Sequence, residues 1–155
     1  MLLELSAVLF ISLIGATYYR AQQFTKRAEL ETPPIGDFIN VNGTPVHYVK
    51  QGSGPVLLMI HGAGGHLKDF TFDLAGRFEK DFTVIAIDRP AHGYTPALGN
   101  SGASLAQQSQ LIVDTVRTLG VKNAYVLGYS YGGAVSLNMA TGYPDFVKGL
   151  VLLSS

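Results

Sequence analysis

A serine between two glycines is the residue of this 155-residue chain best suited to covalent chemistry. Residues 128–132 read G-Y-S-Y-G and match the pattern G-x-S-x-G around Ser130. An apolar run precedes the motif at residues 124–127, and a small-residue pattern of helical type follows it at residues 133–140. A strand that turns sharply into a helix would hold the serine hydroxyl exposed at the edge of a sheet, in a strained backbone conformation. The pattern therefore predicts a serine nucleophile.

The groups that would activate this serine do not follow it. In sites of this type an acid and then a histidine base come after the serine along the chain. Residues 131–155 contain one carboxylate, Asp145, and no histidine. A serine without a base is a weak nucleophile, so we expect this chain to be inactive by itself. All the histidines precede Ser130: His47, His61, His66 and His92.

Composition excludes several other classes of protein. The formal net charge is zero and no strongly basic stretch occurs, which argues against nucleic acid as a partner. There is no cysteine, so disulfides, thiolate metal sites and cysteine nucleophiles are excluded. No cluster of histidines and acids has metal-ligand spacing, and the glycine-rich loop at residues 62–65 has neither the P-loop nor the dinucleotide-binding pattern. We expect no metal and no cofactor.

The first 20 residues form an apolar segment. Residues 5–19 are almost wholly apolar, and Tyr18, Tyr19 and Arg20 suit a membrane interface. The run is shorter than the roughly 20 residues of a spanning helix and has the length of a signal-peptide core. We favour a membrane anchor or uncleaved signal, with the domain on the cytoplasmic side; a cleaved signal and a periplasmic location, or a helix packed on the domain, are the alternatives.

The remaining chain is divided into a linker and one domain. Residues 21–36 are polar and then contain prolines, which suits a linker before a domain over residues 37–155. Asn42-Gly43 between two alternating apolar runs predicts a β-hairpin. Strands and helices alternate after it, which predicts a three-layer α/β fold with a mostly parallel sheet. Further strands are expected at 56–60, 82–87, 124–127 and 149–153, and helices at 67–78, 105–119 and 133–142.

Three motifs give residues 37–155 a resemblance to the alpha/beta-hydrolase superfamily, in its serine-nucleophile branch. Residues 61–65 read H-G-A-G-G, residues 88–95 read D-R-P-A-H-G-Y-T, and residues 128–133 read G-Y-S-Y-G-G. Each follows a predicted strand, in the order found in that family. The resemblance covers the N-terminal half of the family's fold, so the fold looks truncated.

The resemblance implies roles for particular residues. Ser130 would be the nucleophile, and the backbone N–H groups of Ala63 and Tyr131 would form the oxyanion hole. Small residues around Ala63 fit this role, because the substrate oxygen must reach the main chain. Five further residues are expected to line the site or to shape its loops: His61, Gly62, Gly64, His92 and Tyr129.

The other polar residues receive structural interpretations. His61 is expected to shape the oxyanion loop, and His92 is a better substitute for the missing base than His66, although neither is expected to replace it. His47 is predicted to be a solvated strand position. Asp88 is expected to pair with Arg89 or to accept hydrogen bonds from loop amides, and Asp145 to end a helix.

These expectations define a serine hydrolase that acts on small-molecule carboxylic esters or similar acyl substrates through an acyl-enzyme. A C–C bond hydrolase and a cofactor-free haloperoxidase keep the serine elbow and are the enzymatic alternatives. Dehalogenases and epoxide hydrolases of this type are disfavoured, because the resemblance would then require aspartate at position 130. A non-catalytic, membrane-associated binding protein on the same fold is the alternative from another class. The truncated sheet is expected to self-associate through its apolar edge.

Overall fold

The computed structural model describes residues 2–99 and 103–155, with side chains described from residue 6 onward. The chain divides into two compact units, and the boundary along the sequence falls between Pro34 and Ile35. Each unit is considered by itself.

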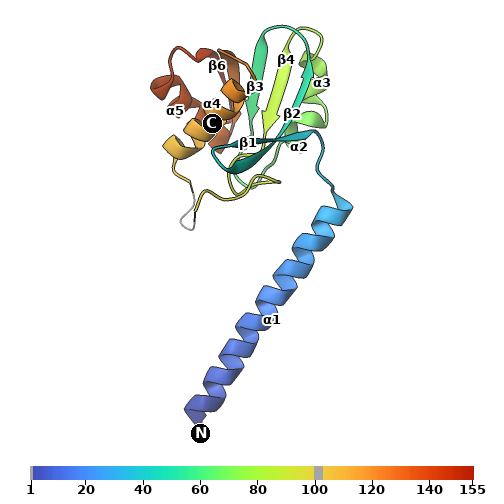
Figure 1. Cartoon of the computed structure of the whole chain (residues 1–155), viewed down its shortest axis with the longest axis vertical. Coiled ribbons are helices and arrows are strands. Elements are labelled where there is room, and N and C mark those ends of the chain that lie inside the picture. Colours follow the sequence, from blue (N-terminus) through green and yellow to red (C-terminus); the bar gives the residue numbers. More distant parts are fainter. Residues whose placement is uncertain (1, 100–102) are drawn as a thin grey trace. The chain divides into compact units, whose positions relative to one another are not determined.

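The N-terminal unit is one long helix, α1, over Leu2–Glu31 (Figure 1). The helix continues through residues 21–31, where the sequence predicted the start of a linker. Alanine, glutamine, lysine, arginine and glutamate dominate this stretch and favour helix, and Arg27 pairs with Glu31 one turn later at 2.7 Å. Prolines, which end helices, first occur at positions 33 and 34.

The apolar side chains of α1 are exposed. Residues from Val8 to Ile14 include large hydrophobic side chains that are more than half exposed, among them Phe10 at 65%. Within the described part of the chain, no helix is both long and apolar enough to cross a membrane. The start of the apolar segment, residues 1–5, lies outside the described side chains.

The C-terminal unit is built on a six-stranded mixed sheet with the order β1-β2-β4-β3-β5-β6 (Figure 1). The hairpin strands β1 and β2 are antiparallel, β2 pairs antiparallel with β4, and the remaining pairs are parallel. The predicted antiparallel hairpin ahead of an α/β sheet is confirmed, but the sheet is mixed, because β2 also pairs antiparallel with β4. The strands are β1 Asp37–Val41, β2 Thr44–Gly52, β3 Val56–Ile60, β4 Thr83–Ile87, β5 Ala124–Tyr129 and β6 Val147–Leu153.

The predicted hairpin turn forms at Asn42-Gly43. Both residues have positive φ, 51° and 86°, as a two-residue turn between twisted strands requires. The side-chain oxygen of Asn40 accepts a hydrogen bond from the Gly43 amide at 2.9 Å. Local sequence therefore determines this turn and, through it, the register of the first two strands.

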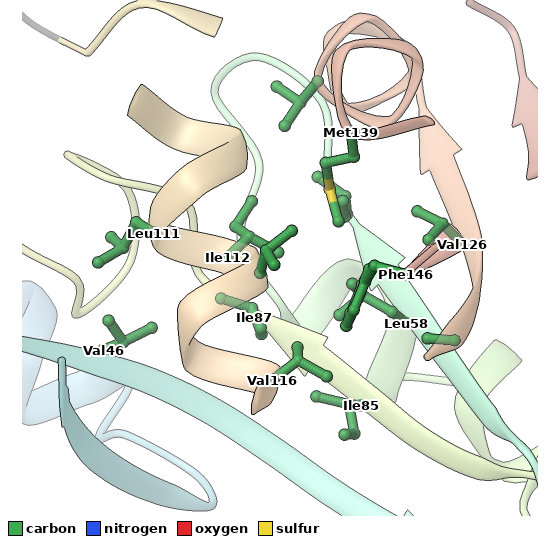
Figure 2. Close-up of a cluster of buried hydrophobic side chains, with 14 of the residues drawn as sticks. Val46, Leu58, Ile85, Ile87, Leu111, Ile112, Val116, Val126, Met139 and Phe146 are labelled. Carbon is green, nitrogen blue, oxygen red and sulfur yellow. The ribbon is translucent and has the colours of Figure 1, made fainter. Parts of the chain in front are cut away.

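Helices cover both faces of the sheet. On one face α4 (Leu105–Thr118) and α5 (Tyr131–Gly142) pack over a core that includes Leu58, Ile85 and Phe146 (Figure 2). On the other face α2 (Lys68–Thr71) and α3 (Leu74–Phe78) cover a smaller core. Alternate residues of the central strands point to opposite cores, which explains why β3 and β4 read as continuous apolar runs. The unit is therefore a three-layer structure.

One predicted helix is divided in two. The apolar spacing of residues 67–78 predicted a single helix, but the structure has α2 and α3 with a break at Asp73. Asp73 leaves the helical region, with φ −148°, and its carboxylate instead pairs with Arg77 at 2.7 Å. The helix expected at residues 105–119 is α4, and its predicted capping box between Ser104 and Gln107 is present.

The sheet order brings three loops to one place. The chain passes from β3 to its neighbour β4 and then returns across β3 to β5. Ligand sites in open α/β sheets lie beyond the carboxyl ends of the strands where the order reverses in this way. The loops that follow β3, β4 and β5 carry the three motifs singled out in the sequence.

Two leucines of this sheet should respond differently to truncation. Leu58 is fully buried in β3, whereas Leu152 in the edge strand β6 is 41% exposed. We expect Leu58→Ala to lower the free energy of unfolding by roughly 2–5 kcal/mol, through lost burial and a residual cavity. Leu152→Ala should cost less than about 1 kcal/mol. Urea unfolding of both variants measures the difference, and equal losses would contradict this core assignment.

Candidate active site

Ser130 lies at an abrupt reversal of the backbone between β5 and α5. Its φ of 51° and ψ of −121° fall in a region that L-residues rarely adopt, and such strained conformations concentrate at functional sites. The Ser130 amide donates to the Leu153 carbonyl at 2.9 Å, and the Ser130 carbonyl accepts from the Gly133 amide at 2.8 Å. Main-chain hydrogen bonds on both sides therefore hold the strained residue in place.

The loop after β3 packs directly against this reversal. A β-carbon placed on Gly62 would lie 3.1 Å from the β-carbon of Ser130. A β-carbon on Gly132 would collide with the carbonyl oxygens of Ile60 and His61. Glycine at both positions thus allows the two main chains to approach closely. The structure brings the 61–65 loop and the serine together, as the sequence predicted.

Two main-chain amides adjoin this contact. Tyr131 is the first residue of α5, so its N–H has no partner within the helix. Ala63 directly follows Gly62, and within the described part of the chain its N–H donates to no other group. From the sequence, Ala63 and Tyr131 were proposed as oxyanion donors. Ala63 follows Gly62 and Tyr131 follows Ser130, so both lie next to the contact between Gly62 and Ser130.

His61 is a buried, neutral part of the loop. It is 0% exposed, its Nδ1 lies 2.9 Å from the Gly62 carbonyl oxygen, and its Nε2 accepts a hydrogen bond from the Arg89 amide at 2.9 Å. The pKa of His61 is lowered to about 4, chiefly by burial and also by the positive charge of Arg89, which together outweigh the opposing effect of the Gly62 carbonyl. Because its only lone pair is already used, His61 cannot accept a proton from a serine.

His92 and His66 also lack the geometry of a base. The half-buried His92 places Nδ1 2.9 Å from the Pro90 carbonyl oxygen and Nε2 3.2 Å from Nη2 of Arg89. Its acceptor nitrogen therefore faces a donor. His66 is part of an exposed turn in which its Nδ1 lies 3.6 Å from a carboxylate oxygen of Asp69.

His47 is not the solvated strand residue that the sequence predicted. It is 1% exposed, with Nδ1 2.6 Å from Asp88 Oδ2 and Nε2 2.5 Å from the Ile35 carbonyl oxygen. The rings of Phe38 and Tyr94 pack around it. Alternation along β2 was a poor guide because Val46 and His47, which point to opposite faces of the sheet, are both buried at this point of the strand.

Asp88 is a structural residue, as expected. It accepts hydrogen bonds from loop amides, which was one of its two expected roles, but it does not pair with Arg89, which was the other. Its carboxylate accepts hydrogen bonds from the amides of Leu67 at 2.7 Å and Tyr94 at 2.9 Å, and contacts His47 rather than Arg89. Burial alone would raise the pKa of Asp88, but these hydrogen bonds outweigh it and hold the pKa below its ordinary value. Asp145 is exposed in the turn before β6.

Gln108 and the full environment of Arg89 were missed by the sequence interpretation. Arg89 is 1% exposed and its guanidinium contacts Gln108 on α4, 2.8 Å away. An arginine directly after a buried strand signals an unusual environment, but no sequence pattern links it to a glutamine nineteen residues later. Gly64, with φ 69°, and Tyr129, 44% exposed, occupy the loop and the strand end predicted for them.

Comparison with known proteins identifies the class. The family described as alpha/beta hydrolase fold matches residues 55–155. That match covers more than half of the chain, so the chain belongs to the alpha/beta hydrolase fold family. Sequence and structure thus agree on the fold, and the serine elbow lies within the matched region.

Individual relatives are larger than this chain. It is 35% identical over 119 residues to the dihydrolipoyllysine-residue acetyltransferase component of the acetoin cleaving system of Cupriavidus necator, covering 76% of this chain and 31% of that protein. It is 29% identical over 113 residues to (E)-2-((N-methylformamido)methylene)succinate hydrolase of Acinetobacter baylyi, covering 73% and 42%. The chain therefore spans less than half the length of these curated relatives.

This chain also covers less than half of two similar solved structures. An epoxide hydrolase from Vigna radiata superposes with a TM-score of 0.72 at 23% identity, covering 78% of this chain and 40% of the other. A meta-cleavage product hydrolase superposes with a TM-score of 0.69 at 25% identity, covering 75% and 44%. The likeness to the epoxide hydrolase is a likeness of fold.

The buried state of His61 predicts a pH dependence of stability. Its pKa is about 4 in the folded chain and 6.5 in the ordinary state, so between these values the unfolded chain binds a proton that the folded chain does not. Stability should therefore fall as the pH is lowered from 6.5 to 4, by up to about 3 kcal/mol from this group. The loss should be smaller in His61→Gln and unchanged in the exposed-turn control His66→Gln. Urea unfolding at several pH values measures it, and parallel curves for all three proteins would exclude His61 as the cause.

Proposed function

We propose that Ser130 is the nucleophile of a serine hydrolase that cleaves small-molecule carboxylic esters or similar acyl substrates. The serine oxygen attacks the acyl carbon, the alcohol leaves, and water releases the acyl group from the enzyme. The observation that carries this proposal is the strained φ of Ser130 exactly where β5 turns into α5, against the glycine of the neighbouring loop. A serine placed in an ordinary turn would need neither the strain nor the close approach.

The amides of Ala63 and Tyr131 are proposed to stabilise the charge that develops on the substrate oxygen. Both amides adjoin the contact between Gly62 and Ser130, and both lack an acceptor in the described part of the chain. A fixed donor of this kind contributes about 10²–10³ to the rate when it is aimed at the oxyanion. Backbone donors also explain why the loop consists of glycine and alanine.

The base and its acid partner are proposed to come from a part of the whole protein outside these residues. Three of the histidines, His47, His61 and His92, have both ring nitrogens in contact with other groups of the chain. The relatives described above are more than twice as long as their matched region. The 155-residue chain is therefore expected to turn over ester substrates poorly or not at all.

Three other functions remain as alternatives, two of them enzymatic and one a binding protein without catalysis. C–C bond hydrolysis is favoured by the structural likeness to a meta-cleavage product hydrolase, and cofactor-free haloperoxidase chemistry uses the same serine elbow. Serine at position 130 disfavours epoxide hydrolysis, for which the resemblance requires aspartate. A binding protein without catalysis would keep the fold but would not need a reactive serine.

Covalent labelling tests the nucleophile directly. In the gene product at its natural length, a fluorophosphonate probe should label Ser130 and abolish hydrolysis of p-nitrophenyl esters, and Ser130→Ala should lose both labelling and turnover. Ser136→Ala is the matched control, since Ser136 lies on α5 with its hydroxyl bonded to the Gly132 carbonyl at 2.8 Å. Peptide mass spectrometry locates the label. An active protein that is labelled at another residue, or not at all, would exclude this mechanism.

The helix α1 is proposed to attach the domain to the cytoplasmic side of a membrane. The support is its exposed apolar surface from Val8 to Ile14, followed by Tyr18, Tyr19 and Arg20. A charge in the middle of such a surface opposes its burial among lipid chains. Ile11→Glu should therefore move the protein from the sedimented membranes to the supernatant, whereas Leu30→Glu near the helix end should not. A wild-type protein that does not sediment with the membranes would contradict attachment.

A further inference from the structure

Arg89 is a buried cation without a buried anion to match it. It directly follows β4 and is 1% exposed, and within the described residues no carboxylate pairs with it. The adjacent carboxylate of Asp88 is bonded to His47 and to the Leu67 and Tyr94 amides instead. Burying a charge in this way is costly unless its hydrogen bonds are satisfied. The placement therefore calls for an explanation beyond stability.

The donors of Arg89 converge on the loop that follows β3. Its Nε donates to the His61 carbonyl at 2.9 Å, and its Nη2 donates to the Gly62 carbonyl at 2.7 Å. Its own main-chain amide donates to Nε2 of His61 at 2.9 Å. Two consecutive carbonyls and one ring are thus held by a single residue from the neighbouring strand end. The rigid, planar guanidinium suits this multiple contact, which an ammonium group could not reproduce.

The orientation of the Gly62 carbonyl determines the direction of the Ala63 N–H. These two groups belong to one planar trans peptide, in which C=O and N–H point in opposite directions. The Gly62 oxygen faces Nη2 of Arg89, Nδ1 of His61 at 2.9 Å and the Gly65 amide at 3.3 Å. The Ala63 N–H must then point away from the guanidinium. If this peptide rotated, it would present an oxygen where the developing oxyanion needs a donor.

Other contacts fix Arg89 itself. Gln108 of α4 accepts from Nη1 at 2.8 Å, and the same glutamine donates to the Ala103 carbonyl at 2.9 Å. The guanidinium carbon also lies 5.0 Å from the centre of the Tyr131 ring, a distance typical of a cation–π contact. Arg89 therefore contacts Gly62 through its carbonyl oxygen and Tyr131 through its ring.

We propose that Arg89 is a positioning residue that aims the Ala63 amide at the reaction oxyanion, with Gln108 holding the guanidinium in place. The inference rests on the proposed function of Ser130 and adds a reason why a cation is buried beneath the loop. It assigns no direct contact with substrate to Arg89. Its effect on the reaction passes through the Gly62–Ala63 peptide.

The catalytic test uses the gene product at its natural length with two substrates, a carboxylic ester and the matching thionoester. In the thionoester, sulfur replaces the carbonyl oxygen of the ester. Arg89→Met should lower kcat for the ester by about 10²–10³, the loss expected for one oxyanion donor, with a smaller change in KM. It should also lower the ratio of ester to thionoester rates, because an aimed N–H favours oxygen over sulfur. Arg89→Lys, which keeps the charge without the planar donors, should fall between Arg89→Met and wild type.

Controls separate positioning from folding. Arg117→Met removes another arginine that lies over aromatic rings, those of Tyr143 and Phe146, and should leave both rates unchanged. If Arg89→Met does not fold, Gln108→Met keeps the arginine and removes only its Nη1 partner, and should lower kcat and the ratio in the same direction by a smaller factor. A folded Arg89→Met protein with reduced kcat but an unchanged ratio would overturn the proposal and leave Arg89 a structural residue.

A second readout does not depend on catalysis. In ¹H–¹⁵N spectra of protein labelled with ¹⁵N-alanine, Arg89→Met should shift the Ala63 amide resonance, whereas Arg117→Met should not. An unmoved Ala63 resonance would overturn the positioning role. A moved resonance in a protein whose Ser130 proves unreactive would support the positioning of the peptide and reject the proposed hydrolase function instead.

Discussion

Two charged side chains at the end of β4 hold the loops around Ser130 in place. Asp88 accepts hydrogen bonds from the Leu67 amide at the start of α2 and from the Tyr94 amide in the loop after β4. It also contacts the His47 ring of β2. Arg89 binds the carbonyls of the loop after β3. The two neighbours thus use charge-assisted hydrogen bonds of opposite kind, one accepting and one donating. Without them, glycine-rich loops beyond the sheet would have little to define their conformation.

This arrangement explains why the fold was predictable and part of the site was not. The hairpin at Asn42-Gly43, the capping box at Ser104, and the buried runs of β3 and β4 all depend on local chemistry that the sequence displays. The elbow at Ser130 was predictable for the same reason, because its glycines and flanking patterns are contiguous. Contacts between distant segments carry no such local signal.

His47, Arg89 and Asp73 show where sequence reasoning ended. His47 alternates like a surface residue, and only its contacts with Phe38, Tyr94 and Asp88 show that it is buried. The role of Arg89 depends on three segments that converge from different parts of the chain. The break at Asp73, where the backbone leaves the helical region, falls inside an otherwise regular helical spacing of apolar residues and has no signal in that spacing. The location of the protein and its self-association stay predictions.

The hydrogen bond from the Ser130 amide to the Leu153 carbonyl extends the ladder between β5 and β6 one step into the elbow. The strained backbone at the serine is therefore braced by an edge strand whose last apolar side chains, Val151 to Leu153, are 39–47% exposed. Edge strands are among the first elements to open in local unfolding. Fraying of β6 in this chain would relax the elbow before the central sheet melts, so the strained backbone at Ser130 would be lost together with the margin of the sheet.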